Sequence, residues 1–271
     1  MNFQNKSLNS SSNLFKKKNM TTNEALVKYC LRLGDSSLIL GQRMADWCSK
    51  GPILEEDIAL SNIGLDLFGQ SRTMLTYAGE TEGKGRTEND LAFKRLERGF
   101  FNNLMSERPN GHFGDTVARN LFHSAFTYHL YKKLSSSSDS TIAAFAAKSL
   151  KEVTYHLRHS GEWMIRLGDG TKESHNKIQQ SVNDLWEYTG DLFAMNEVDE
   201  LLISEKIAVD LNEIKPLWDN TINEILERST LTRPVDGFMQ KGSLNGIHSE
   251  DLGHILTEMQ FLPRAYPNSK W

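Results

Sequence analysis

The scarcity of proline is the feature that most restricts how this chain can fold. The 271 residues include six prolines, and four of these lie beyond residue 200. Because proline breaks or kinks a helix, the earlier part of the chain can form long helices, and its apolar residues recur about every 3.6 positions rather than every second position. Pro216 should kink or split the seventh of the helices that we predict. The predicted helices cover residues 23–49, 54–79, 88–107, 113–134, 139–167, 173–191, 197–228 and 246–261.

No boundary between domains is visible in the chain. There is no internal repeat, and no shift of composition separates one half from the other. We therefore predict a single all-α domain over residues 21–271, built on long antiparallel helices. Residues 1–20 are polar and basic and contain no acid. We expect a disordered tail there, or translation that begins near Met20, in preference to a targeting helix rich in arginine.

Composition excludes several classes of partner. The formal net charge is −4, which argues against nucleic acid because a basic surface is the usual requirement. No apolar stretch approaches the roughly 18 residues of a membrane span, so we expect no membrane contact. Cys30 and Cys48 share one predicted helix, which would hold them roughly 27 Å apart at about 1.5 Å per residue, beyond disulfide reach. Unpaired cysteines indicate a reducing compartment, and we expect the cytoplasm.

The run from Lys151 to His159 nearly matches the metal-binding helix of a di-iron bundle. Such bundles take a Glu from each of two helices and a Glu-x-x-His pair from each of two others. Here Tyr155 stands three residues after Glu152, and the histidine follows one place late, at His156. No Glu-x-x-His occurs anywhere in the sequence. The motif is therefore defective at the position that a metal requires.

Polar residues interrupt the apolar faces of other helices. One interpretation makes Asp66, Glu152, His156 and His159 iron ligands, whereas the other is a buried network in which the acids pair with histidine or arginine. Counting ligands favours the network, since amides bind iron weakly and a di-iron site needs about four carboxylates. We predict no metal ligand and no catalytic residue, but a degenerate metal-site polar core. Its members are Gln42, Asp66, Gln70, Asn120, Glu152, Tyr155 and His156.

The segment 79–86 resembles a phosphate-binding loop but is one residue short and carries Gly85 where Ser or Thr is needed. It more plausibly forms an exposed loop, in which Lys84 and Arg86 could contact an anion. No zinc motif and no nucleophile motif accompanies it.

Several stretches together resemble one family with high specificity. The sequence is similar to the structural (C) subunits of the bacterial ring-1,2-phenylacetyl-CoA epoxidases, and the resemblance covers about residues 22–271. It rests on residues 31–35, 40–43, 57–67, 69–72, 90–93, 108–111, 151–158, 168–171 and 258–267.

The resemblance implies a ferritin-like four-helix-bundle core with additional helices. It implies a multicomponent enzyme of aerobic phenylacetate degradation that inserts one oxygen atom of O₂ into the ring of phenylacetyl-CoA. A sister subunit of the same fold holds the di-iron centre, small subunits join the complex, and an NADPH-dependent reductase supplies electrons. The present chain would be catalytically silent, carry no cofactor, and bind and stabilise the catalytic subunit. Lys84 and Arg86 would be candidates to hold the coenzyme A phosphates.

Two other classes of function remain open at this point. The chain could be a di-iron or single-metal oxygenase or oxidase in its own right, which metal analysis would reveal. It could instead be a solitary helical interaction module, which would fail to co-purify with an epoxidase catalytic subunit. For the favoured role, we expect the outer faces of the first helices and the loop at 79–88 to contact the catalytic partner.

Overall fold

A computed structural model describes residues 20–267 and 269, so the predicted tail over 1–20 lies outside the described residues except for Met20. This part of the chain is helical and contains no strand, which confirms the all-α prediction. None of its helices is long and apolar enough to cross a membrane. The α-helices are α1 (Thr22–Ala45), α2 (Leu54–Glu82), α3 (Glu88–Phe93), α4 (Leu104–Glu107), α5 (Phe113–Leu134), α6 (Ser140–Gly168), α7 (Lys172–Trp186), α8 (Glu197–Ser204), α9 (Leu211–Arg228) and α10 (Glu250–Ala265). Short 3₁₀ helices are η1 (Glu97–Gly99), η2 (Thr189–Phe193) and η3 (Ser243–Asn245).

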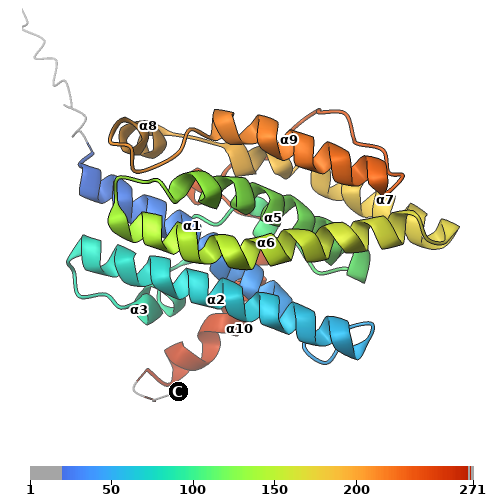
Figure 1. The fold of residues 1–271 in the computed structure, drawn as a ribbon. Coiled ribbons are helices and arrows are strands. Elements are labelled where there is room, and N and C mark those ends of the chain that lie inside the picture. Colours follow the sequence, from blue (N-terminus) through green and yellow to red (C-terminus); the bar gives the residue numbers. More distant parts are fainter. Residues whose placement is uncertain (1–19, 268, 270–271) are drawn as a thin grey trace, which may run out of the picture.

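Four long helices, α1, α2, α5 and α6, form the central bundle. Figure 1 shows α7, α8 and α9 on one side of this bundle and α3 and α10 on the other. The pair α1 and α2 packs closely because small residues face the partner helix. A Cβ atom added at Gly34 would lie 2.9 Å from Leu75, and one added at Gly64 would lie 3.2 Å from Met44. Larger side chains at these two positions would therefore force the helices apart.

Local signals explain where the bundle helices begin and end. Thr21 and Glu24 form a capping box at the start of α1, and Asp139 accepts two backbone N–H groups at the start of α6. Gly83 ends α2 in the left-handed conformation, with φ at 67°, which glycine adopts without strain. Among the four bundle helices, the predicted boundaries differ most at α1, which ends at Ala45, so Cys48 lies beyond the helix. Both cysteines are free thiols.

The predicted helix over 197–228 is two helices, α8 and α9. The break is stabilised from the turn before α6, since Ser138 donates to the carbonyl of Glu205 at 2.8 Å and Ser137 to that of Ile207 at 2.7 Å. Pro216 lies inside α9 and does not interrupt it. Of the kink or split predicted at Pro216, the split does not occur there, because side chains distant in sequence stabilise a break about ten residues earlier.

A buried ion pair holds the segment between α3 and α4 against α1. The fully buried carboxylate of Asp35 accepts hydrogen bonds from both terminal nitrogens of Arg95, one of them at 2.9 Å. It also accepts the backbone N–H of Phe101 at 2.9 Å, while Arg95 donates to the carbonyl of Gly99 at 2.6 Å. The backbone leaves the helical path to make these contacts. The single helix predicted over 88–107 is therefore wrong, and α3, η1 and α4 replace it.

A second buried pair holds the start of α10 against α4. The side chains of Glu107 and His248 are both fully buried, with Nδ1 of the histidine 3.0 Å from the carboxylate. Nε2 of His248 lies 2.9 Å from the carbonyl oxygen of Phe100, which can only accept. Both ring nitrogens therefore face acceptors, which favours the imidazolium form. Burial alone would lower the pKa of His248, but the hydrogen bonds to Glu107 and Phe100 outweigh it and raise that pKa.

Candidate functional site

Polar pairs join α2 to α6 along the seam where the sequence predicted a degenerate metal site. Gln70 donates from Nε2 to the Glu152 carboxylate at 2.9 Å. About one turn earlier on α2, Asp66 lies 3.0 Å from Nε2 of the buried His156. Each polar group of this seam thus has one partner on the facing helix. The sequence analysis paired both acids with histidine or arginine. Asp66 does lie beside His156, whereas the partner of Glu152 is the amide of Gln70.

The seam contains a third pair that the sequence analysis missed. The carboxylate of Glu56 lies 2.8 Å from Nε2 of His159, and the side chains of both residues are about nine-tenths buried. In the sequence, Glu56 stands out only as negative charge at the start of a predicted helix. It lies seven residues before the buried Ile63 and fourteen before Gln70, and this heptad spacing was the signal that could have placed it on the seam.

The structure corrects two members of the predicted polar core, Tyr155 and Gln42. The side chain of Tyr155 is 38% exposed, because three residues after Glu152 the helix has turned it toward solvent beside Arg158. Gln42 lines a cavity between α1 and α10 instead of pairing with the polar groups of the seam. Asn120 is buried and donates to the sulfur of Met44 at 3.3 Å. The seam is also less dry than predicted, since the Asp66 side chain is 37% exposed.

The donor set of the seam does not converge on one point. Across residues 20–267, no three side chains of histidine, cysteine, aspartate or glutamate gather closely enough to hold a metal ion. His123, a further buried histidine on a bundle helix, is far from ionising, since burial lowers its pKa to about 3. The three acids of the seam, Glu56, Asp66 and Glu152, are therefore each bonded to one partner on the facing helix, which suits a structural seam.

The predicted anion contacts Lys84 and Arg86 are tied to a neighbouring acid. Lys84 lies 3.0 Å from the Glu82 carboxylate, and Arg86 binds both oxygens of that group at 2.6 and 2.7 Å. The hydrogen bond from Arg86 lowers the pKa of Glu82, although burial acts in the opposite direction. Both cations of this loop thus have an internal counter-ion.

Restoring one acid of a metal site is expected to destabilise the seam. Gln70→Glu would place a second carboxylate beside Glu152, where Gln70 now lies at 2.9 Å. Repulsion should raise the pKa of one carboxyl, so we expect a loss of about 1–3 kcal/mol in the free energy of unfolding at pH 7.5. The loss should shrink as the pH falls through that raised pKa. Urea unfolding at pH 7.5 and 5 measures it, with Thr154→Glu on the exposed side of α6 as control. A loss of equal size at both pH values would contradict the repulsion.

Comparison with known proteins gives concordant similarities. The profile of the phenylacetic acid catabolic protein family matches residues 13–271. The chain is 46% identical over 246 residues to the C subunit of the 1,2-phenylacetyl-CoA epoxidase of Escherichia coli (strain K12), covering 91% of this chain and 99% of that one. A solved Synechococcus protein with aldehyde deformylating oxidase activity aligns with a TM-score of 0.51 at 14% identity, covering 88% of this chain and 100% of the other. This last similarity concerns the fold alone, and with it the predicted ferritin-like architecture is confirmed.

Proposed function

This chain belongs to the phenylacetic acid catabolic protein family, and on that premise we propose that it is the non-catalytic structural subunit of a multicomponent phenylacetyl-CoA 1,2-epoxidase. It binds and stabilises a ferritin-like catalytic subunit that carries the di-iron centre. Small subunits and an NADPH-dependent reductase complete the complex, which acts on phenylacetyl-CoA in the cytoplasm during aerobic phenylacetate degradation.

The observation that carries this proposal is the paired seam between α2 and α6. A bundle that binds two metal ions directs about four carboxylates and two histidines to one point. In this chain each acid of the seam instead bonds one histidine or one amide. Such pairs give the buried polar groups hydrogen-bond partners within the chain. On this proposal, the catalytic chemistry takes place in another subunit.

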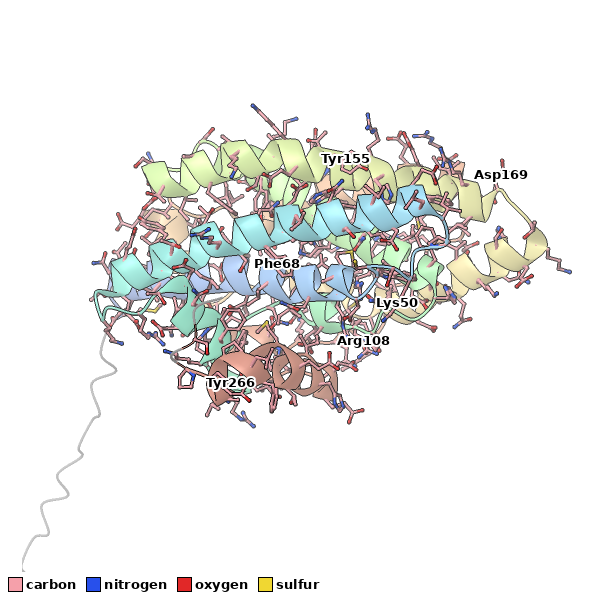
Figure 2. The ribbon with its side chains drawn as sticks, turned by 90° about the horizontal axis from the view of Figure 1, so that it is seen from below. Lys50, Phe68, Arg108, Tyr155, Asp169 and Tyr266 are labelled. Carbon is pink, nitrogen blue, oxygen red and sulfur yellow. The ribbon has the colours of Figure 1, made fainter. Side chains whose placement is uncertain are left out.

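An exposed apolar face suggests where the catalytic subunit binds. Ile58 and Leu65 on α2 are both more than half exposed and, being seven residues apart, lie on one stripe of the helix. Figure 2 shows α2 together with α10, with Tyr266 labelled at the end of α10. We name this surface the docking face. It consists of Ile58, Leu65, Leu96, Phe261, Leu262 and Tyr266, all exposed.

The docking face differs in part from the surface expected from the sequence. Exposed large apolar side chains occur on α2, as expected, but none of those described lies in the loop at 79–88. The two cations of the loop, Lys84 and Arg86, are already paired with Glu82. Apolar patches of this kind mark stable interfaces. We therefore propose that the catalytic subunit contacts α2 and α10 and does not contact the loop at 79–88.

Co-expression with the catalytic subunit tests the proposed function. We expect this chain to co-purify with that subunit, iron to follow the catalytic subunit, and this chain alone to contain none. About two irons per isolated polypeptide, with turnover of O₂, would replace the proposal by an oxygenase acting on its own. Failure to co-purify, with both chains folded, would leave a helical module unrelated to the epoxidase.

A charge on the docking face is expected to dissociate the complex. Leu65→Arg would bury an unpaired guanidinium if the partner covers α2, so we expect affinity for the catalytic subunit to fall by about a hundredfold or more. Unfolding of the isolated chain should change little, because Leu65 is exposed. Gel filtration and titration with the catalytic subunit measure the effect. Leu217→Arg on α9, which lies on the opposite side of the bundle (Figure 1), is the matched control. Equal binding by both variants would contradict the assigned face.

A further inference from the structure

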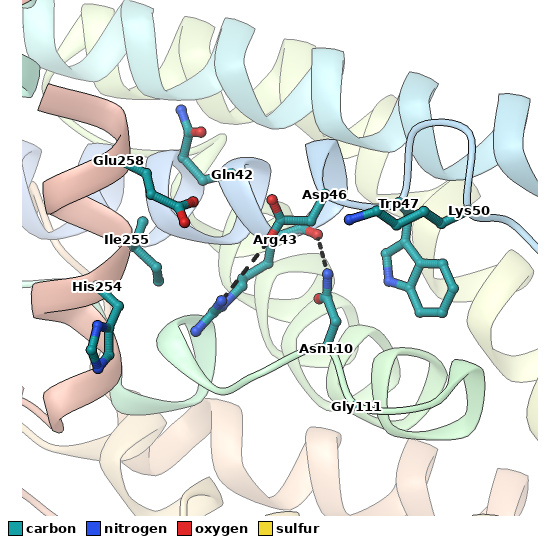
Figure 3. A pocket seen from close by; sticks show the side chains of 10 residues that line it. All are labelled: Gln42, Arg43, Asp46, Trp47, Lys50, Asn110, Gly111, His254, Ile255 and Glu258. Carbon is teal, nitrogen blue, oxygen red and sulfur yellow. Dashed lines mark hydrogen bonds and ion pairs between the residues drawn. The ribbon is translucent and has the colours of Figure 1, made fainter. Parts of the chain in front are cut away.

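A cavity of about 490 Å³ lies between the C-terminal end of α1, the loop around Asn110, and α10. Its size falls within the usual range for small-molecule sites, about 300–1,000 Å³. Figure 3 shows Arg43, Trp47 and Lys50 on the α1 side, and Ile255 and Glu258 across from them on α10. The paired seam between α2 and α6 contributes no residue to this cavity.

The walls of the cavity are fixed by hydrogen bonds. Asn110 donates from Nδ2 to the carbonyl of Arg43 at 2.8 Å, and thereby caps the last turn of α1. Arg43 in turn donates through Nε and one terminal nitrogen to the carbonyl of Glu107, at 3.2 and 2.7 Å. Its other terminal nitrogen has only a carboxylate of Asp46 near it, at 3.9 Å. The Arg43 guanidinium is thus positioned by a neutral carbonyl, and one of its edges is available to a ligand in the cavity.

An aromatic side chain forms the flat part of the wall. Trp47 donates from Nε1 to the hydroxyl of Thr116 at 2.9 Å, and its ring meets Phe113 edge-on at 6.0 Å between centroids. Ile255 faces this region from α10. The cavity therefore joins a rigid apolar surface to a charged one, as ligand sites commonly do.

A buried cation without a counter-ion lies behind the loop. Arg119 is fully buried, and its guanidinium donates only to neutral acceptors, namely the carbonyls of Arg108 and Pro109 and the amide oxygen of Asn110. Its Nε has no partner among the described residues. Burial lowers the pKa of Arg119 to about 9, so the side chain remains charged at neutral pH. The charge of Arg119, which has no direct ion pair among the described residues although Asp115 and Asp46 lie near it, raises the positive potential of the wall in front of it.

The charged side chains around the cavity differ in exposure, and only Arg43 among them is largely buried. The inner cation Arg43 is 14% exposed, whereas the nearest acid, Asp46, is 46% exposed and belongs to the rim. Glu258 is exposed on α10, and the further acid Asp251 is engaged by Arg108 at 2.8 Å. Lys50 makes no ion pair with any other described residue. The α1 side thus carries two cations, the inner Arg43 and the exposed Lys50, and one exposed acid, Asp46.

We propose that this cavity binds a phosphate group of an anionic ligand, which Arg43 and Lys50 hold, while Trp47 and Ile255 contact its less polar part. On the proposed function, which this step rests upon, the ligand is the coenzyme A portion of the thioester substrate. Arg119 contributes through its charge and through the loop that it fixes, and it does not touch the ligand. Lys84 and Arg86, the candidates from sequence, are unsuited because Glu82 already binds both.

Binding of coenzyme A to the full-length chain and to its complex with the catalytic subunit tests this site. Calorimetry should give saturable binding that Lys50→Glu weakens by about tenfold. Asp46→Asn should strengthen binding by about two- to fivefold, since it removes an acid at the rim. Lys84→Glu is the control for an equal change of charge elsewhere. Pantetheine, which lacks the phosphates, should not bind, and competition by inorganic phosphate should follow the same order of variants.

The possible outcomes separate this proposal from the proposed function. Absence of saturable binding by this chain, or equal affinities for wild type, Lys50→Glu and Asp46→Asn, would overturn the site. Weakening by Lys84→Glu would move the site to the other loop and overturn it as well. Binding of inorganic phosphate without coenzyme A would support the phosphate site and overturn its assignment to the thioester. If Lys50→Glu abolished only the complex with the catalytic subunit and left coenzyme A binding unchanged, the cavity would instead bind an acidic part of that subunit. The proposal would then be wrong. Loss of co-purification in the wild type would instead count against the proposed function.

Discussion

Replacing Asp35 with alanine is expected to lower the free energy of unfolding by about 3–5 kcal/mol. The change would leave the guanidinium of Arg95, whose side chain is 7% exposed, without its carboxylate. It would also leave the backbone N–H of Phe101 without its acceptor. A buried cation that loses its partner retains the desolvation cost and loses the attraction that offset it. The segment between α3 and α4 should therefore separate from α1.

Chemical unfolding of the isolated chain measures this effect. Glu162→Ala, which removes an exposed acid on α6, is the matched control and should change stability little. The double variant Asp35→Leu with Arg95→Leu should recover much of the loss, because no charge is then left buried. A double variant as unstable as Asp35→Ala would show that the segment is held by packing rather than by the ion pair.

Replacing His248 with alanine is expected to cost about 3 kcal/mol or more near pH 6, because it leaves the fully buried carboxylate of Glu107 without its cation. The backbone N–H of Ser249 would still donate to that carboxylate at 2.7 Å, and the amide of Asn102 at 3.0 Å. These neutral donors cannot supply the missing charge. Since the pair holds the first turn of α10, hydrogen exchange should become faster in that helix before the rest of the chain unfolds.

The pH dependence of this pair has a definite sign. The pKa of His248 is raised in the folded protein above its usual value of about 6.5. The stabilisation is therefore complete below pH 6.5 and is lost as the pH rises through the folded pKa. Apart from Glu107, the charge that favours the imidazolium is Asp35, also buried. The difference in unfolding free energy between wild type and His248→Ala should decrease from pH 6 to 9.

Arg228→Ala, which breaks an exposed pair on α9 worth no more than about 0.5 kcal/mol, should show no such trend. A constant difference would indicate that His248 is neutral in the native state.

The existence of the long helices followed from periodicity, and their interruptions did not. The bundle helices near 23–49, 54–79, 113–134 and 139–167 needed only local signals, namely an apolar stripe and a cap. The breaks after Phe93 and after Ser204 depend on contacts with residues far away in sequence, Asp35 and Ser138. A pattern read along one segment carries no information about such partners.

The candidate site was predictable to a similar degree. That Glu152 and His156 would find polar partners across the bundle followed from their position on an apolar face, and Gln70 and Asp66 are those partners. Tyr155 was misplaced because the sequence was aligned with the metal motif by residue spacing alone. A residue three positions further along a helix is rotated by about 300°, so its exposure depends on the width of the apolar face. The cavity at the end of α1 was invisible in the sequence, since α1, the loop around Asn110 and α10 meet there only in the fold.

The outward orientation of Tyr155 has a consequence for protein engineering. Tyr155→His would complete a Glu-x-x-His motif in the sequence, yet its imidazole would stand on the solvent side of α6 and not beside Glu152 in the bundle. Placing that imidazole beside Glu152 would therefore require rotating or re-registering a helix of 29 residues along its length. On the proposed function, the orientation of α6 thus opposes a mutational return to a metal-binding subunit.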